Sequence, residues 1–335
     1  MLRFIVRRLL QMVGVLFVLS ILLFAWVRRL PGGPVDAICG ERCTAEQKAA
    51  LAKQLGIDRP VWEQYFTFLN NALHGRFGTS TGVLPGTDAM EIFLRRLPAT
   101  IELSIGAILL ALLIGIPLGY LAAKKRGGIL DNLTVTSTLI GIAVPVFFLA
   151  FALKYYFAIK LHILPLQGRQ DSIDATRVTG FFVLDGIITQ EWDAAWNAFK
   201  HLILPSIALA TIPFAVIVRI TRASVLDVVN EDYVRTAEAK GLTVGTIRWR
   251  HVLRNALLPV VTTLGLQVGA LLTGAVLTET VFVWGGVGES LASALRLKDY
   301  AVIQVFILMA AAGYVFINLL VDIAYAVIDP RVRTR

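Results

Sequence analysis

The residues that could do chemistry are few and scattered. Two cysteines, Cys39 and Cys43, and four histidines are the strongest metal ligands and nucleophiles in the 335 residues. They form no HExxH, CxxC or other metal-ligand pattern, and no GxxxxGK[ST] loop is present to cradle nucleotide phosphates. The sequence therefore predicts no cofactor, no metal and no enzyme active site. If ATP powers this protein, another chain must bind it.

Composition indicates an integral membrane protein. Hydrophobic residues make up 56% of the chain and charged residues 16%, whereas a soluble domain carries about 25% charged residues. The apolar residues gather in runs near the length that crosses about 30 Å of hydrocarbon. The first run is longer than a signal peptide's apolar region, so we expect it to be retained. The predicted spans are residues 9–27, 101–123, 133–157, 202–220, 258–282 and 302–327.

These runs predict an all-α integral membrane protein with six transmembrane helices. We divide it into an N-terminal tail with the first span (1–30), an extracytoplasmic loop (31–98) and a core (99–335). The loop should be helical, because Thr44-x-x-Gln47 is a capping box and Pro60 suits the first turn of a second helix.

Glycines and prolines inside the spans predict their packing. Gly115-x-x-x-Gly119 and Gly265-x-x-x-Gly269 allow close helix contact. Each proline removes a backbone hydrogen bond and favours a kink. The prolines are Pro117, Pro145, Pro205, Pro213 and Pro259.

Positive charge predicts the orientation. Half of the 32 Lys and Arg residues lie in the N-terminus, the turn at 124–126, the segment 219–254 and the C-terminal tail. These flanks alternate along six spans, which places both termini in the cytoplasm. The net charge of +9 then reflects topology and contact with anionic membrane lipid, not nucleic acid.

This topology places Cys39 and Cys43 outside the cytoplasm. An oxidising exterior permits a disulfide across their four-residue spacing. The alternative is two reduced thiols, and a metal site from two cysteines alone is not expected.

One acid lies inside a predicted span. Asp322 is about two turns inside the sixth span, and an intramembrane acid is by default a functional candidate. The alternative that we prefer is a structural ion pair with Arg219 or Arg222, at the inner end of the fourth span.

Other polar residues could line a translocation path. Glu102 and Glu279 lie near the outer ends of their spans, where each could contact a substrate's amino group or simply face lipid headgroups. Further pore-facing candidates are Gln267, Gln304 and Asn318.

The segment between the fourth and fifth spans carries the clearest local pattern. Glu231 and Asp232 favour a helix start, and Lys240 with Gly241 favours its end. Thr243 can cap a second helix. The pattern predicts an elbow of helix, glycine turn and helix at 228–258. By local physics alone it could equally be an ordinary amphipathic surface loop.

This elbow resembles the EAA loop of binding-protein-dependent ABC transporter permeases. It keeps Ala237, Gly241 and the closing Leu258-Pro259, but has Arg235 and Thr236 at the first two positions. Its spacing from glycine to proline is also longer than the general pattern. Both departures resemble the dipeptide/oligopeptide/nickel subfamily, as do the strings at 235–241 and 254–259.

The resemblance extends over nearly the whole chain. One departure is Gly285, where the family often has proline, which would alter only an outer turn. The other matching strings are residues 7–10, 55–60, 97–103, 279–282, 299–300 and 329–333.

The resemblance implies a type I ABC importer permease in a bacterial plasma (inner) membrane. It implies half of a pore, completed by a homologous second permease, with an extracytoplasmic substrate-binding protein and two ATPase subunits, or one fused. Dipeptides or oligopeptides are the implied substrates, and nickel, haem or glutathione the alternatives. The implied coupling residues are Arg235, Thr236, Ala237, Glu238, Ala239, Lys240 and Gly241, with Arg254, Asn255 and Pro259 at the elbow's end.

Two other classes of protein compete with this interpretation. An ion-coupled carrier or channel would usually show paired inverted repeats with broken helices, which the six spans lack. A membrane enzyme would need clustered His, Asp or Ser residues near a span end, and no such cluster occurs in the sequence.

Overall fold

The computed structural model describes the chain except residues 1, 30–34, 36–38, 40–42, 55 and 329–335. The described chain is helical almost throughout and divides into two compact units. Unit 1 comprises residues 1–98 and 285–335, and unit 2 comprises residues 99–284. The predicted basic C-terminal tail lies outside the described residues.

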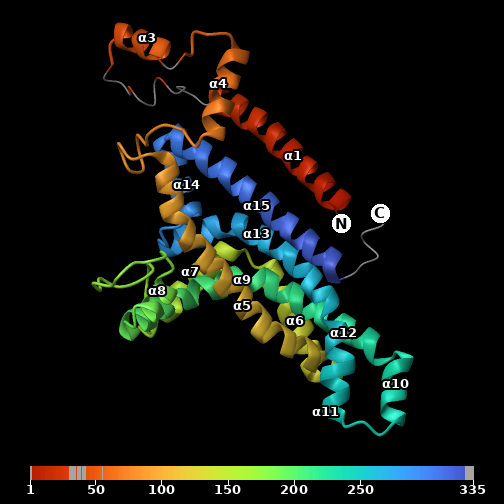
Figure 1. The fold of residues 1–335 in the computed structure, drawn as a ribbon. Helices are drawn as coiled ribbons and strands as arrows, with labels where there is room; N and C mark the ends of the chain where they lie inside the picture. Colours follow the sequence, from red (N-terminus) through yellow and green to blue (C-terminus); the bar gives the residue numbers. More distant parts are fainter. Residues whose placement is uncertain (1, 30–34, 36–38, 40–42, 55, 329–335) are drawn as a thin grey trace. The chain divides into compact units, whose positions relative to one another are not determined.

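Figure 1 shows the helices in chain order. The helices of the first half are α1 (Leu2–Arg29), α3 (Ala45–Gln54), α4 (Val61–Leu73), α5 (Ala89–Lys124), α6 (Ile129–Ala143), α7 (Val146–Leu153) and the π-helix η1 (Lys154–Lys160). Those of the second half are α8 (Phe182–Ile188), α9 (Trp192–Val229), α10 (Asp232–Ala239), α11 (Val244–Thr246), the π-helix η2 (Ile247–Leu253), α12 (Arg254–Ala256), α13 (Leu258–Phe282), α14 (Val287–Leu297) and α15 (Tyr300–Ile328).

The number of membrane-spanning segments agrees with the sequence prediction. In the described chain five helical segments are long and apolar enough to cross a membrane, and a bent pair raises the number to six if it forms one span. The all-α membrane fold is therefore confirmed. The five segments are Val6–Arg29, Ala89–Lys124, Trp192–Val229, Val244–Gly269 and Tyr300–Val321. The fourth of them includes the second arm of the predicted elbow, and it overlaps the predicted span 258–282 only from residue 258 onward.

The third predicted span is not one continuous helix. Helix α6 ends at Ala143 and α7 begins at Val146, with a bend of 103° between α6 and the following helical segment. Val144 is extended (φ −78°, ψ 124°) and Pro145 N-caps α7. Proline disfavours helical backbone at the preceding residue and cannot donate to the preceding turn. The expected kink is thus a complete break.

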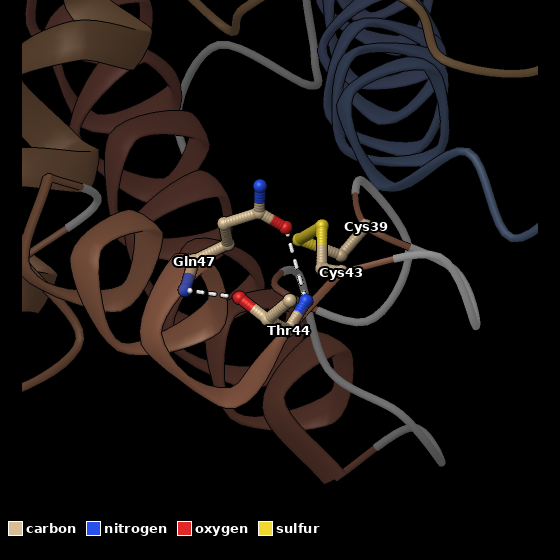
Figure 2. The surroundings of a disulfide bond; sticks show 4 residues. All are labelled: Cys39, Cys43, Thr44 and Gln47. Atoms are coloured by element: carbon tan, nitrogen blue, oxygen red, sulfur yellow. Dashed lines mark hydrogen bonds between the residues drawn. A yellow bond between two sulfur atoms is a disulfide. The ribbon is translucent and has the colours of Figure 1, made fainter.

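Unit 1 pairs the first and last spans. Helix α1 packs beside α15 (Figure 1), with Leu23, Val27 and Tyr300 buried in their contact. The predicted capping box is present, because Gln47 N–H donates to Thr44 Oγ1 at 3.3 Å and Thr44 N–H donates to Gln47 Oε1 at 3.0 Å. Figure 2 shows this cap beside the Cys39–Cys43 disulfide, whose Cα atoms are 5.2 Å apart.

Unit 2 is built around the long helix α9. Its Pro205 and Pro213 are buried inside the helix. Helix α5 approaches α9 through glycines, since a Cβ on Gly119 would lie 2.7 Å from the Val218 carbonyl oxygen, and one on Gly115 would lie 3.1 Å from Ile217 Cγ2. The predicted small-residue contact at 115–119 is therefore real, and α9 is its partner.

We expect Gly119→Ala to destabilise the protein by about 1–3 kcal/mol, because the added methyl group must displace helix backbone in a packed interior. The matched control is Gly14→Ala in α1, where a Cβ meets nothing within 4 Å. That change should be neutral or slightly stabilising, since alanine has the higher helix propensity. Thermal unfolding in detergent measures both, and equal midpoints for the two variants would contradict the close contact.

Candidate functional site

The elbow between α9 and α13 has the predicted local structure. Helix α10 ends at Ala239, and Gly241 follows with φ +72°, a left-handed conformation that suits glycine. Thr243 N-caps the next helix, its hydroxyl accepting from Thr246 N–H at 3.4 Å. The result is a compact hairpin of α10, α11, η2 and α12 (Figure 1).

A small apolar core fixes the elbow to the long helices. Val234 from α10 and Val252 and Leu253 from η2 are buried against Ala123 near the end of α5 and Val225 near the end of α9. In an interior packed to crystal-like density, such a cluster moves as a unit. A force on the elbow would therefore act on α5 and α9 together.

Hydrogen bonds close the two arms of the elbow. Asn255 Nδ2 donates to the Tyr233 hydroxyl oxygen at 2.9 Å and to the His251 carbonyl oxygen at 3.0 Å. The sequence indicated Asn255 as an elbow residue, but it did not indicate Tyr233 as its partner. The bond joins α10 to α12 and holds the hairpin closed.

The exposed surface of the elbow differs in one respect from the expectation. Arg235, Thr236, Glu238, Ala239, Lys240 and Gly241 are exposed, as are Arg254, Asn255 and Pro259. Ala237, in contrast, is 4% exposed and faces the protein interior. The elbow also exposes apolar side chains that the sequence did not indicate, among them Leu242, Val244 and Trp249.

An ion pair that the sequence did not indicate lies next to the elbow. Arg222 of α9 binds Asp131 of α6 in a bidentate manner, with Nε–Oδ1 at 2.5 Å and Nη2–Oδ2 at 2.8 Å. Asp131 also accepts from Gly127 N–H at 2.9 Å. Arg222 thus has Asp131 as a partner, and Arg219 is exposed. The side chain of Asp322 lies outside the described residues, so its pairing stays a prediction.

Both candidate path carboxylates are buried inside unit 2. Glu102 accepts from Arg169 Nη2 at 2.5 Å and from Val183 N–H at 2.9 Å. Burial lowers the pKa of Arg169, and the adjacent Glu102 carboxylate opposes that shift. Glu279 is fully buried and accepts from the Thr100 hydroxyl at 2.6 Å. Within this chain both acids join helices and loops, which is a structural use.

The other path candidates are half-buried. Gln267 lies in α13, whereas Gln304 and Asn318 lie in α15. Gln304 lines a cavity of unit 1. A pore-facing role of these three residues stays a prediction. Among the described residues no group of three or more His, Cys, Asp or Glu side chains could hold a metal ion.

A further acid organises unit 1. Asp299, directly before α15, accepts from the Ser80 hydroxyl at 2.5 Å and from the N–H groups of Gly82 and Val83 at 2.9 and 3.0 Å. Burial raises the pKa of this carboxyl, but the hydrogen bonds outweigh burial and hold the pKa below its ordinary value. Asp299 thereby fastens the turn at 80–83 to the start of the last span.

Comparison with known proteins decides the family. The family model "Binding-protein-dependent transport system inner membrane component" matches residues 115–334, and "Binding-prot-dependent transport system membrane comp, N-term" matches residues 1–104. The chain belongs to this permease family. The resemblance seen in the elbow is thus confirmed over the full length of the permease.

Similar proteins match this permease from end to end. The dipeptide transport system permease protein DppB of Escherichia coli (strain K12) is 43% identical over 338 residues, which cover 99% of each chain. The di/tripeptide transport system permease protein DppB of Pseudomonas aeruginosa is 43% identical over 335 residues and 99% of each chain. The dipeptide transport system permease protein DppB of Alkalihalophilus pseudofirmus is 42% identical over 334 residues, which cover 99% of this chain and all of the relative.

The Asp131–Arg222 pair gives a testable prediction for this permease. Arg222→Ala should cost about 1–3 kcal/mol of stability, because it leaves the Asp131 carboxylate without its charge partner, while the partly exposed site lets water replace some of the lost contact. Asp131→Ala with Arg222→Ala should cost less than the sum of the single changes. Unfolding of the purified protein in detergent gives the three values.

The matched control is Arg219→Ala, an exposed arginine one turn earlier in α9. We expect a change within about 0.5 kcal/mol, as at other surface positions. A loss as large as that of Arg222→Ala would mean that Arg219 holds the buried acid instead.

The Asp299 cluster predicts a pH dependence. Since its folded pKa is lowered, the carboxylate contributes stability that is present above the unfolded pKa of about 3.9 and is lost as pH falls through the folded pKa. Asp299→Asn should therefore destabilise by about 1–3 kcal/mol at pH 7. The difference between wild type and variant should shrink in acid below about pH 4. A difference that stays constant over this range would contradict the prediction.

Proposed function

We propose that this permease forms half of the translocation pore of an ATP-driven importer of dipeptides or oligopeptides. A homologous second permease completes the pore, two ATPase subunits (or one fused) supply the energy, and an extracytoplasmic binding protein delivers the peptide. The observation that carries the proposal is the elbow, which presents exposed side chains on a base that is packed into α5 and α9. The names of the relatives support the peptide as substrate.

The elbow is suited to transmit a mechanical displacement. Leu242, Val244 and Trp249 offer apolar contact to an ATPase cleft, and Arg235, Glu238 and Lys240 offer charge around it. Closure of the ATPase subunits would move the elbow as a rigid body. The apolar core below it and the Asp131–Arg222 pair would then carry the displacement to α5, α6 and α9.

The proposed membrane is the bacterial inner membrane, with both termini in the cytoplasm. Arg248, Arg250 and Arg254 add to the positive charge of the elbow, which favours the cytoplasmic side. The opposite side then holds the Cys39–Cys43 disulfide, α3 and α4, in an environment that permits disulfides. A binding protein would dock on this outer face.

We expect Gly241→Val to reduce peptide uptake by more than tenfold while the complex remains assembled. Valine at φ +72° is strained by about 1–2 kcal/mol or more, so the tip of the elbow must change shape where it meets the ATPase. Uptake of a labelled dipeptide and ATP hydrolysis are measured in vesicles that contain both permeases, the ATPase subunits and the binding protein.

The matched control is Gly86→Val. Gly86 also has a positive φ, +85°, and a Cβ there meets nothing within 4 Å. It belongs to unit 1 and is distant in sequence from the elbow, which belongs to unit 2. Equal losses of uptake in the two variants would contradict coupling through Gly241. The substrate is tested in the same vesicles by adding unlabelled dipeptides, nickel, haem or glutathione as competitors of labelled dipeptide uptake. Failure of unlabelled dipeptides to compete would overturn the peptide as substrate.

A further inference from the structure

Unit 1 contains a cavity of about 620 Å³ that the transport function does not explain. Its walls are the last turns of α1, the inner side of α4, the first turn of α15 and the loops at 56–59 and 76–81. Three aromatic rings line it: Phe24, Phe68 and Phe77. Both α1 and α15 are membrane-spanning candidates. The cavity therefore lies at the depth where spans leave the hydrocarbon and lipid headgroups begin.

The cavity is cationic. Arg28, Arg59 and Arg76 all line it, and the described part of its lining contains no Asp or Glu. Within the described residues none of the three guanidinium groups has a carboxylate partner. Arg28 lies over the Phe24 ring with 4.2 Å between its Cζ and the ring centroid, which fixes its plane. Three arginines that have no carboxylate partner in the described part of the chain favour an anionic ligand with several oxygen acceptors.

A buried acceptor in the same cavity also lacks a partner. Gln64 is 8% exposed, and its Oε1 makes no hydrogen bond within the described chain. Two carbonyl oxygens fix the orientation of its amide, because Nε2 donates to those of Ile57 at 3.0 Å and Arg59 at 2.5 Å. A buried acceptor without a donor costs about 1–3 kcal/mol. The missing group is therefore a donor that a ligand would bring.

The outer side of α4 indicates where that ligand comes from. Trp62, Phe66 and Leu73 are 64–78% exposed, and they form one stripe at helical spacing. A helix with such a stripe lies in the membrane interface with its apolar side in the acyl region. Trp26, near the end of α1, is also exposed, as interfacial tryptophans are. The cavity behind α4 thus opens among lipids.

We propose that this cavity binds the headgroup of an anionic glycerophospholipid. The phosphate accepts hydrogen bonds from Arg28 and Arg76, a headgroup hydroxyl donates to Gln64 Oε1, and the acyl chains extend along the exposed apolar sides of α1 and α4. The bound lipid joins α4 to the ends of α1 and α15.

The test uses dioctanoyl phosphatidylglycerol and the full chain, purified in its complex in a neutral detergent, with bound lipid counted by native mass spectrometry. Wild type should bind phosphatidylglycerol at least tenfold more tightly than dioctanoyl phosphatidylcholine, which has no headgroup hydroxyl and no net charge. Arg76→Gln should weaken phosphatidylglycerol binding by about tenfold, the loss of one charge-assisted contact. Arg76 is exposed, so this change should leave the unfolding midpoint without lipid unaltered.

Arg29→Gln is the matched control, since Arg29 is the exposed neighbour of Arg28 and does not line the cavity. It should change binding by less than about twofold, because exposed charge pairs contribute little. If both variants weakened phosphatidylglycerol binding equally, the binding would reflect surface charge alone and the proposal would be overturned. Equal binding of phosphatidylglycerol and phosphatidylcholine by the wild type would also overturn it. Glycerol 1-phosphate binding as tightly as the lipid would assign the cavity to a soluble phosphate, and displacement by dialanine would assign it to the transported peptide.

Discussion

Burying charge in a membrane protein requires that the partner lie within the protein, because hydrocarbon offers none. In unit 2 this requirement is met by Glu102 with Arg169, Glu279 with Thr100, and Asp131 with Arg222. Each pair joins segments that are distant in sequence, so satisfying the charge also fixes the packing. These three acids thus hold helices and loops of unit 2 in place, whatever else they do in an assembled transporter.

The elbow depends on this packing. Its base shares a core with α5 and α9, and α5 itself touches α9 through Gly115 and Gly119 without room for a methyl group at Gly119. Interfaces with so little free space are displaced together and do not deform continuously. The glycine turn at the tip has free space around it, since a Cβ on Gly241 meets nothing within 4 Å, whereas the base of the elbow is closely packed. A coupling element requires both, because a partner must reach the tip and the base must pass the displacement on.

Features with a local cause could be predicted from the sequence. The capping box at Thr44, the left-handed Gly241 and the cap at Thr243 each follow from side chains within a few residues, and all three occur in the structure. The spans follow from the length of apolar runs, which needs no knowledge of neighbours. At Pro145 the sequence predicts a kink, because proline removes a backbone hydrogen bond. It does not predict a complete break, because the size of the bend depends on the neighbouring helices.

Partners that are distant in sequence could not be predicted. Asp131 lies in the first turn of α6, where an acid is favoured without any distant partner. The sequence instead suggests Arg219 or Arg222 as the partner of Asp322, because Asp322 is an acid inside a span and the arginines lie at the inner end of another. The resemblance implies Ala237 as a coupling residue, yet a small apolar side chain also suits the interior, where Ala237 lies. An acid in an apolar run therefore predicts that a partner exists, while the fold alone decides which residue it is.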